Sequence, residues 1–151
     1  MDYSKTQNID PSHFTSDKQG DLYSYWQKIR GDRVMPCRHD LDPADIPHLL
    51  SAIWLADVVR EDQIYFKVRL FGTKLVQAFQ LEGTHLRLDS VSFSGDIIER
   101  LNNLVITKNP YFYVCDFPVE SPDFRKYSTL TLPMSSNDDT VDVIISYVHC
   151  Y

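Results

Sequence analysis

The clearest pattern along the chain is an alternation of apolar and polar residues that stops at a glycine. Even positions of Ile64–Phe71 are apolar, whereas Lys67 and Arg69 occupy the opposite side. This period of two predicts a strand with one buried face. Beyond Gly72 the apolar residues of 75–79 resume at helical spacing. The chain therefore turns a sharp corner at Gly72, which glycine permits because it has no side chain to clash.

A helix is predicted from Asp21, which can cap it, to Gly31, which follows its basic last turn. Its apolar side chains fall on one stripe and must be buried, either on the same domain or on a second subunit; they are Leu22, Tyr25, Trp26 and Ile29. Residues 1–20 are polar and lack periodicity, so we expect a mobile leader there. The folded domain would then occupy residues 21–151.

Two further segments have helical signals. Asp42 is a good N-cap followed by a proline at the first helical position, and Pro47 keeps this helix short. A longer helix is predicted from Asp96 to Lys108, where the apolar residues form a continuous stripe. The Asn109–Pro110 pair ends it, because the residue before a proline is pushed out of the helical region.

Four more segments favour strands, at residues 51–59, 111–119, 125–134 and 141–151. Together with Ile64–Phe71 they make five strands. The order along the chain is helices, two strands, several helices and three strands. This order predicts an α+β domain built around an antiparallel sheet.

Composition narrows the class of protein. The chain has 151 residues and a formal net charge of −6, with acidic and basic residues interspersed. It is long enough for one domain with a core, and it lacks the basic face of a direct nucleic-acid binder. No apolar run is long enough to span a membrane or to serve as a secretion signal. With three dispersed cysteines, Cys37, Cys115 and Cys150, we expect a cytoplasmic protein with reduced thiols.

Several blocks of the sequence resemble a PAS domain. The first helix contains Tyr25-Trp26, and a Met-Pro-x-Arg turn follows at residues 35–38. An Asp-Pro-x-Asp-Ile-Pro helix start lies at 42–47, and the next strand contains Asp57. These blocks are similar in order to a PAS subfamily of short, often stand-alone bacterial proteins.

The resemblance continues to about residue 148. Arg69, Gly72 and Thr73 match an Arg-x-x-Gly-Thr corner, and "LTLPMSSNDDTVDVIIS" resembles the last hairpin of the family. The turn at 137–139 lacks the glycine often found there, and residues 82–92 match only loosely. The resemblance implies a PAS-like five-stranded antiparallel sheet with short helices packed over one face and an extra N-terminal helix.

The resemblance also implies a function, that of a sensory or regulatory domain. Such a domain would bind a small apolar or amphipathic ligand between the sheet and the helices and would signal through a protein partner or as a homodimer. The expected pocket residues are the inward side chains of the sheet and the apolar stripe of the Asp96–Lys108 helix: Trp54, Phe66, Val68, Leu70, Leu101, Leu104, Val105, Tyr113, Cys115, Thr129 and Thr131. The same side chains could equally fill a core that holds no ligand. By analogy, the helix face with Leu22, Tyr25, Trp26 and Ile29 is the candidate dimer or partner surface.

No cofactor or metal is predicted from the residues. A helical haem ligand is not expected, because the Asp96–Lys108 helix contains no histidine, and the cysteine-bearing helix of the flavin-binding relatives is absent. His39, Asp40 and Asp42 are neighbours, but Asp42 is expected to cap the helix that follows it. The two remaining ligands on one turn do not make a metal site. The cofactor is therefore left unknown, with haem and flavin disfavoured.

Two alternatives to the ligand-binding sensor remain open. The first is an interaction or dimerisation module whose core is filled by Trp54, Phe66 and Tyr113. The second, ranked last, is a small isomerase-like enzyme with a buried carboxylate from Asp57 or Asp116 and a raised carboxyl pKa. Because no catalytic motif occurs, the chain is not expected to be an enzyme.

Overall fold

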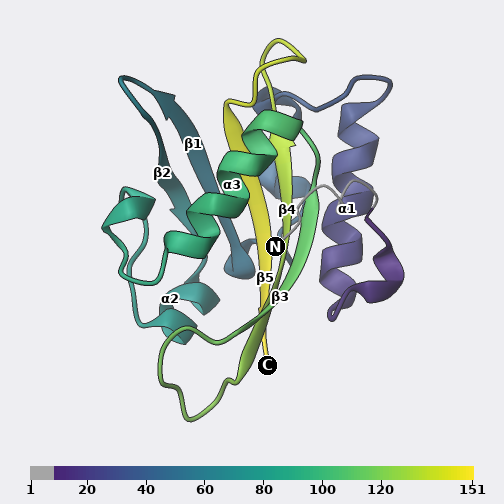
Figure 1. Cartoon of the computed structure of the whole chain (residues 1–151). Coiled ribbons are helices and arrows are strands. Elements are labelled where there is room, and N and C mark those ends of the chain that lie inside the picture. The colour runs from purple at the N-terminus through teal and green to yellow at the C-terminus, as the bar shows by residue number, and fades with distance from the viewer. Residues whose placement is uncertain (1–8) are drawn as a thin grey trace.

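A five-stranded antiparallel sheet with helices on both faces makes up the protein, in a computed structural model that describes residues 9–151 (Figure 1). The strands run in the order β2-β1-β5-β4-β3. Their bounds are β1 Ile53–Arg60, β2 Ile64–Phe71, β3 Tyr111–Asp116, β4 Lys126–Met134 and β5 Val143–Cys150. The predicted α+β fold is confirmed.

The helices form a layer on each side of the sheet. α1 (Asp17–Arg30) lies on one face, and α2 (Thr73–Phe79) and α3 (Gly95–Thr107) lie on the other (Figure 1). Single turns of 3₁₀ helix occur at Pro11–His13, Arg38–Asp40, Pro43–Asp45, Leu50–Ala52 and Leu88–Ser90. Within residues 9–151, no helix has both the length and the apolar character needed to cross a bilayer.

Burial on both faces explains why the last two strands read as almost continuous apolar runs. In β4 every residue from Tyr127 to Met134 is buried, and in β5 the residues from Val143 to Val148 are buried. Successive side chains of a strand point to opposite faces. Odd positions of β4 therefore face α2 and α3, whereas even positions face α1, where Ser128 bonds to Gln19.

The prediction for the start of α1 was wrong. The helix begins at Asp17, and Ser16 caps it in a capping box with Gln19. Gln19 is fully buried and donates to the Ser128 hydroxyl (2.8 Å). The boundary drawn at residue 21 therefore falls inside a helix, and residues 9–20 pack with the domain. The rest of the predicted leader, residues 1–8, lies outside the described residues.

The other predicted elements are shifted by a few residues at most. The short helix after Asp42 is one 3₁₀ turn, and Asp42 caps it as predicted by accepting from the Ala44 N–H (2.9 Å). β3 stops at Asp116, three residues before the predicted end. In the β4–β5 connection Asp138 adopts a left-handed conformation (φ 60°), which aspartate tolerates better than most non-glycine residues.

A bulge in β2 changes which side chains reach the interior. Leu55 pairs with Leu70, but the next residue, Ala56, pairs with Val68, so Arg69 is extra. One additional residue in a strand reverses its subsequent alternation. Leu70 is therefore 37% exposed on the opposite face. Phe71 takes the inward position that alternation had predicted for Leu70.

The corner at Gly72 is required by close packing and not by an unusual backbone. Gly72 has φ −61°, which any residue can adopt. A Cβ at this position, however, would overlap the backbone carbonyl of Ser51. The Gly72 N–H donates to the Ile53 carbonyl (2.9 Å), which holds the start of α2 against β1.

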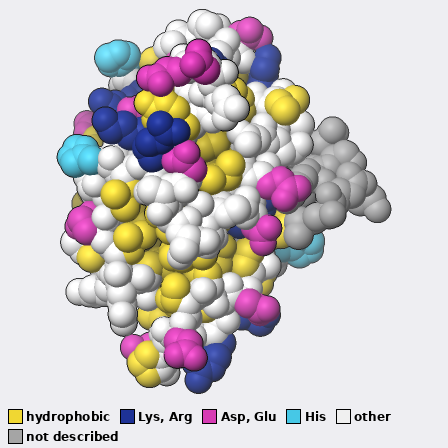
Figure 2. Space-filling model, turned by 60° about the vertical axis from the view of Figure 1, so that its left-hand side comes forward, with side chains coloured by type: hydrophobic (Ala, Val, Ile, Leu, Met, Phe, Trp, Pro, Cys, Tyr) yellow, Lys and Arg dark blue, Asp and Glu magenta, His cyan; other side chains and the backbone are white. Residues whose placement is uncertain are grey.

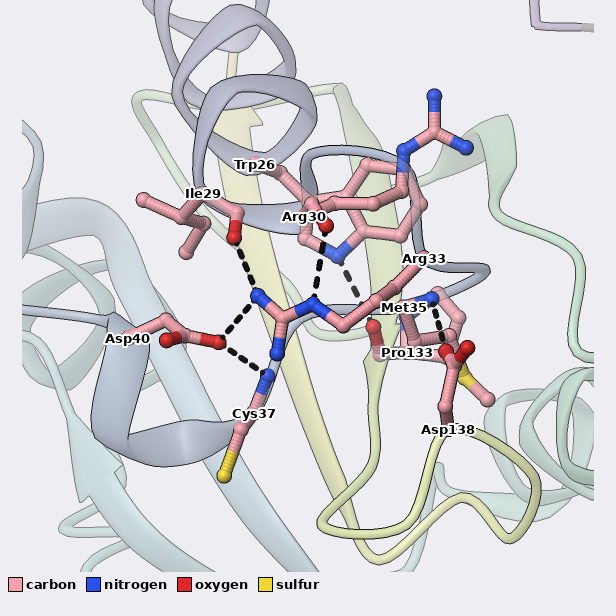
Figure 3. A network of polar contacts seen from close by, with 9 residues as sticks. All are labelled: Trp26, Ile29, Arg30, Arg33, Met35, Cys37, Asp40, Pro133 and Asp138. Carbon is pink, nitrogen blue, oxygen red and sulfur yellow. Dashed lines mark hydrogen bonds and ion pairs between the residues drawn. The ribbon is translucent and has the colours of Figure 1, made fainter.

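A polar network joins the end of α1 to the turn that follows it and to the β4–β5 hairpin (Figure 3). The Arg33 guanidinium donates to the Ile29 carbonyl and to the Asp40 carboxylate, both at 2.7 Å. Asp40 also accepts from the Cys37 N–H (2.8 Å). Nearby, the Trp26 indole N–H donates to the Pro133 carbonyl (2.9 Å). These bonds fix the angle at which α1 lies on the sheet.

Gly72→Ala is expected to lower the free energy of unfolding by about 3 kcal/mol, because the new methyl group meets backbone that cannot move aside. Urea denaturation measures this change. Gly20→Ala is the matched control, since a Cβ at Gly20, inside α1, has no atom within 4 Å. It should stabilise the protein by about 0.5–1 kcal/mol. Equal effects of the two substitutions would contradict the packing argument.

The Cys37 N–H, followed by Arg33, lowers the pKa of Asp40 below its ordinary value. A depressed carboxyl pKa contributes stability that is present above the unfolded pKa of about 3.9 and is lost as the pH falls through the folded pKa. Asp40→Ala should therefore cost about 1 kcal/mol at pH 7 and almost nothing near pH 2. Asp40→Asn keeps an acceptor for the Cys37 N–H, so it should lower the free energy of unfolding less than Asp40→Ala does. Urea unfolding across pH 2–7 measures both, and a pH-independent difference for Asp40→Ala would contradict the assignment.

Candidate functional site

A cavity of about 70 Å³ lies between the sheet and the α2–α3 layer. Its floor is made by all five strands and includes Trp54 of β1, Phe71 of β2 and Val148 of β5. α2, α3 and the segment that joins them close it from above. Figure 2 shows apolar side chains gathered at the surface in the lower part of this side of the molecule, where Figure 1 places α2. The wall is mainly apolar with a few polar groups, as is usual for small-molecule sites.

Three of the predicted pocket residues line this cavity: Trp54, Val68 and Thr129. The remaining predicted residues, apart from Leu70, lie beneath the same helical layer or within it but outside the lining. Phe66, Leu101, Leu104 and Thr131 are buried in the adjoining core, and Val105, Tyr113 and Cys115 are half-buried. Leu70 points to the opposite face because of the bulge in β2.

Three buried hydroxyl groups form a closed cluster in the floor. Thr129 Oγ1 lies 2.6 Å from Ser146 Oγ, and Thr131 Oγ1 lies 3.0 Å from the same atom. Thr129 and Thr131 are 3.2 Å apart. Because these hydroxyls satisfy one another, Thr129 can border an apolar cavity without an unpaired polar group. It remains able to bond to a ligand, since a hydroxyl both donates and accepts.

Aromatic rings make up one end of the cavity. The Phe79 ring stacks on Phe93 and on Phe117, with ring centroids 5.9 and 4.9 Å apart. Tyr127 meets Phe79 edge-on at 5.9 Å. Phe79 was visible in the sequence as part of a helical pattern, but the segment 81–93 has no periodicity. Its contribution to the lining, which includes Leu86 and Phe93, therefore had no sequence signal.

Sequence reasoning missed most of the lining, and Arg100 of α3 is the charged residue among those that it missed. Its side chain is only 3% exposed and lines the cavity. The guanidinium carbon lies 4.7 Å from the centre of the Tyr113 ring, and Nη2 lies 3.4 Å from the Tyr127 hydroxyl. A signal was present, since Arg100 follows Ile97 by three residues and precedes Leu104 by four. Helical spacing therefore places this arginine on the apolar stripe.

The tyrosines beside Arg100 stay protonated. Burial raises the pKa of Tyr111, and burial followed by the nearby Cys115 thiol raises the pKa of Tyr127. Both hydroxyls are therefore neutral at pH 7 and can donate hydrogen bonds. Burial also raises the pKa of Cys150 to about 11, so this thiol lacks the thiolate character of a reactive cysteine.

The α1 face predicted as a partner surface is occupied within the chain. Leu22 and Trp26 are buried against the sheet, and Ile29 packs against the same core. The Tyr25 hydroxyl donates to the Asp45 carboxylate (3.0 Å) and accepts from the Asp42 N–H (3.0 Å). This aromatic face was expected to be buried either on the same domain or on a second subunit. In the structure it is buried on the same domain. The homodimer stays a prediction without an assigned surface.

No carboxylate lines the cavity among the described residues. Asp57 is paired with Arg69 (3.1 Å), and Asp116 is exposed beside Lys126. The isomerase-like alternative required one of these two acids in a pocket, so the structure does not favour it. In residues 9–151 no three His, Cys, Asp or Glu side chains gather as metal ligands.

Comparison with known proteins points to one family. A family model described as "PAS domain" matches residues 14–145. Among solved structures, the sensory box sensor histidine kinase from Vibrio cholerae matches with 15% identity and a TM-score of 0.45. The match covers 93% of this chain and 98% of that chain. The comparison with curated proteins gave no match.

Leu75→Ala should enlarge the cavity, because Leu75 is almost fully buried and forms part of its wall. We expect a loss of about 2–4 kcal/mol in the free energy of unfolding by urea titration. The widened apolar space should also bind benzene, detected as a rise in Tm. Leu70→Ala is the matched control, since Leu70 lies on the other face and should cost less than about 1 kcal/mol. Similar losses at both positions would contradict the cavity geometry.

Proposed function

The chain belongs to the PAS domain family, which makes it a domain of the sensory or regulatory type, and we propose that it binds a small amphipathic ligand in the cavity beneath α2 and α3. The observation that carries the proposal is the composition of the cavity wall. Apolar side chains from β1, β2, β5, α2, α3 and the segment between the two helices converge on one cavity, and β3 and β4 add Tyr111, Tyr127 and Thr129. Few polar groups in an apolar wall suit the orientation of a small molecule.

The signal would pass from the cavity through the sheet to α1. Neighbouring residues of a strand face opposite layers. Thr129 lines the cavity, whereas the preceding residue, Ser128, bonds to Gln19 at the start of α1. In β5, Val148 lines the cavity and the next residue, His149, bonds to Thr15 (2.7 Å). A ligand that shifts β4 or β5 would therefore change the contacts that hold the beginning of α1, from which a partner protein could read the state.

The ligand-free interaction module is the second candidate, and the size of the cavity favours it. About 70 Å³ is small beside the roughly 300–1,000 Å³ of typical ligand pockets. The large rings of Trp54 and Phe79 occupy much of the space between the layers. In this reading the domain would act through its surface alone. The cytoplasmic location and the protein partner stay predictions in either case.

Native mass spectrometry of freshly purified protein, with an absorption spectrum of the same sample, tests the proposal. We expect extra mass that disappears on denaturation. Val148→Phe should abolish this mass, because a larger ring fills the cavity. Val114→Phe is the matched control, since Val114 is 44% exposed on β3 and should leave the bound mass unchanged.

Absence of bound mass from the wild-type protein, together with no Tm response to any small-molecule library, would favour the interaction module. The same spectra report whether the chain is a dimer. Absorption in the visible range would identify a haem or flavin, which are not expected.

A further inference from the structure

Arg100 is the charged side chain among the described residues of the cavity wall, and only 3% of its surface is exposed. The described arginines that form ion pairs are different ones: Arg33, Arg69 and Arg87 each pair at the surface with a neighbouring aspartate. None of the ion pairs between described residues includes Arg100. Asp96 and Glu99 of the same helix are exposed instead of paired with it.

A buried cation without a counter-ion is unfavourable, because the protein interior solvates charge poorly. Arginine cannot escape this cost by releasing its proton, because a guanidinium stays protonated in proteins. Natural proteins retain such a group where it has a task. We therefore infer that the counter-ion of Arg100 is supplied by a bound anion.

The hydrogen bonds of Arg100 leave room for such an anion. A guanidinium has several N–H donors arranged as a planar fork. Nη2 makes one long bond, 3.4 Å, to the Tyr127 hydroxyl. Nε is buried and has no hydrogen-bond partner among the described residues. The Tyr113 ring covers one face of the guanidinium, 4.7 Å from its carbon, so the ring does not use the donors at the edge.

We propose that the cavity binds a small organic carboxylate, with its carboxylate on the guanidinium edge of Arg100 and its apolar part against Phe71, Leu75 and Phe79. The proposal rests on the ligand-binding function proposed above and names the class of ligand. The neutral hydroxyls of Tyr111 and Tyr127 are additional donors near Arg100. Planar carboxylates match the arginine fork with two parallel hydrogen bonds.

Charge and volume select this class of ligand over other anions. The described lining contains one cation and no further basic side chain, which balances a single negative charge. A phosphate ester would bring close to two charges at pH 7. The remaining wall is mainly apolar, so the rest of the molecule should be a short aliphatic chain. The cavity of about 70 Å³ has no room for a large amphiphile.

Isothermal titration calorimetry with propionate and butyrate, each compared with its neutral amide, tests the inference. The titrations are made at pH 7.5 in a buffer free of phosphate and carboxylate. We expect each acid to bind the wild-type protein about tenfold or more tightly than its amide, because a charge-assisted bidentate bond replaces a neutral one. Arg100→Met should reduce this ratio to about one. Lys28→Met, which removes an equal charge from the exposed side of α1, should leave the ratio unchanged.

Thermal unfolding separates this role from a purely structural one. Since Arg100 has no counter-ion, Arg100→Met should leave the Tm of the empty protein unchanged or raised. If Arg100 served only the fold, its replacement would lower the Tm without any change in the acid-to-amide ratio. Tyr127→Phe, which removes one hydroxyl, keeps the test valid should Arg100→Met fail to fold. It should weaken acid binding about threefold or more and amide binding by less, because a hydroxyl donor bonds more strongly to a charged acceptor than to a neutral one.

The outcomes distinguish this inference from the function on which it rests. Amides that bind as tightly as the acids would overturn the inference and leave the ligand-binding function standing. The same holds if neither probe binds but the native mass contains a retained neutral molecule. If no probe binds and no molecule is retained, both proposals fail. A retained carboxylic acid that is lost in Arg100→Met would support both.

Discussion

The antiparallel pairing of β1 with β5 is the constraint on which the rest of the structure depends. It joins the β1–β2 hairpin to the β3–β4–β5 unit, with Trp54 opposite Ser146 and Asp57 opposite Val143. The two strands are separated in the chain by α2, α3 and three other strands, so their pairing closes a long loop and is entropically costly. Only when it has formed does a continuous floor exist for the cavity.

The second consequence of this sheet is that both of its faces are used. α2 and α3 cover one face and α1 covers the other (Figure 1). Adjacent residues therefore serve different layers, as Ser128 and Thr129 do in β4. A change in the geometry of a central strand cannot be confined to one side, because the packed interior has little free volume. The fold thus supplies a physical link between the cavity on one face of the sheet and the helix on the other face.

The preference of arginine for an exposed or ion-paired position is not met at Arg100, which is buried and forms no ion pair with a described residue. Every other part of the α3 stripe is apolar and packs into the core, as its amphipathic pattern requires. An arginine on this stripe breaks the rule that buried charges are paired. Such violations concentrate at functional sites, where stability is given up for another property. The Thr129, Thr131 and Ser146 cluster shows the opposite solution, since its polar groups satisfy one another within the sheet.

The sequence by itself determined the element types, most of the strand parity and the turn chemistry, because these depend on neighbours in the chain. Alternation in residues 64–71 predicted β2, and Gly72 marked the corner after it. Asp42 was predicted to cap the turn that follows it, and it caps Pro43–Asp45. Ser16 and Gln19 also carried a readable capping signal for the true start of α1.

Tertiary structure alone decided the bulge at Arg69, the burial of the α1 face on its own sheet and the burial of Arg100 without an ion pair to any described acid. These features depend on how separate segments contact one another, which no pattern within a single segment encodes. The register of β1 against β2 sets the first, and the closing of both helical layers over one sheet sets the others.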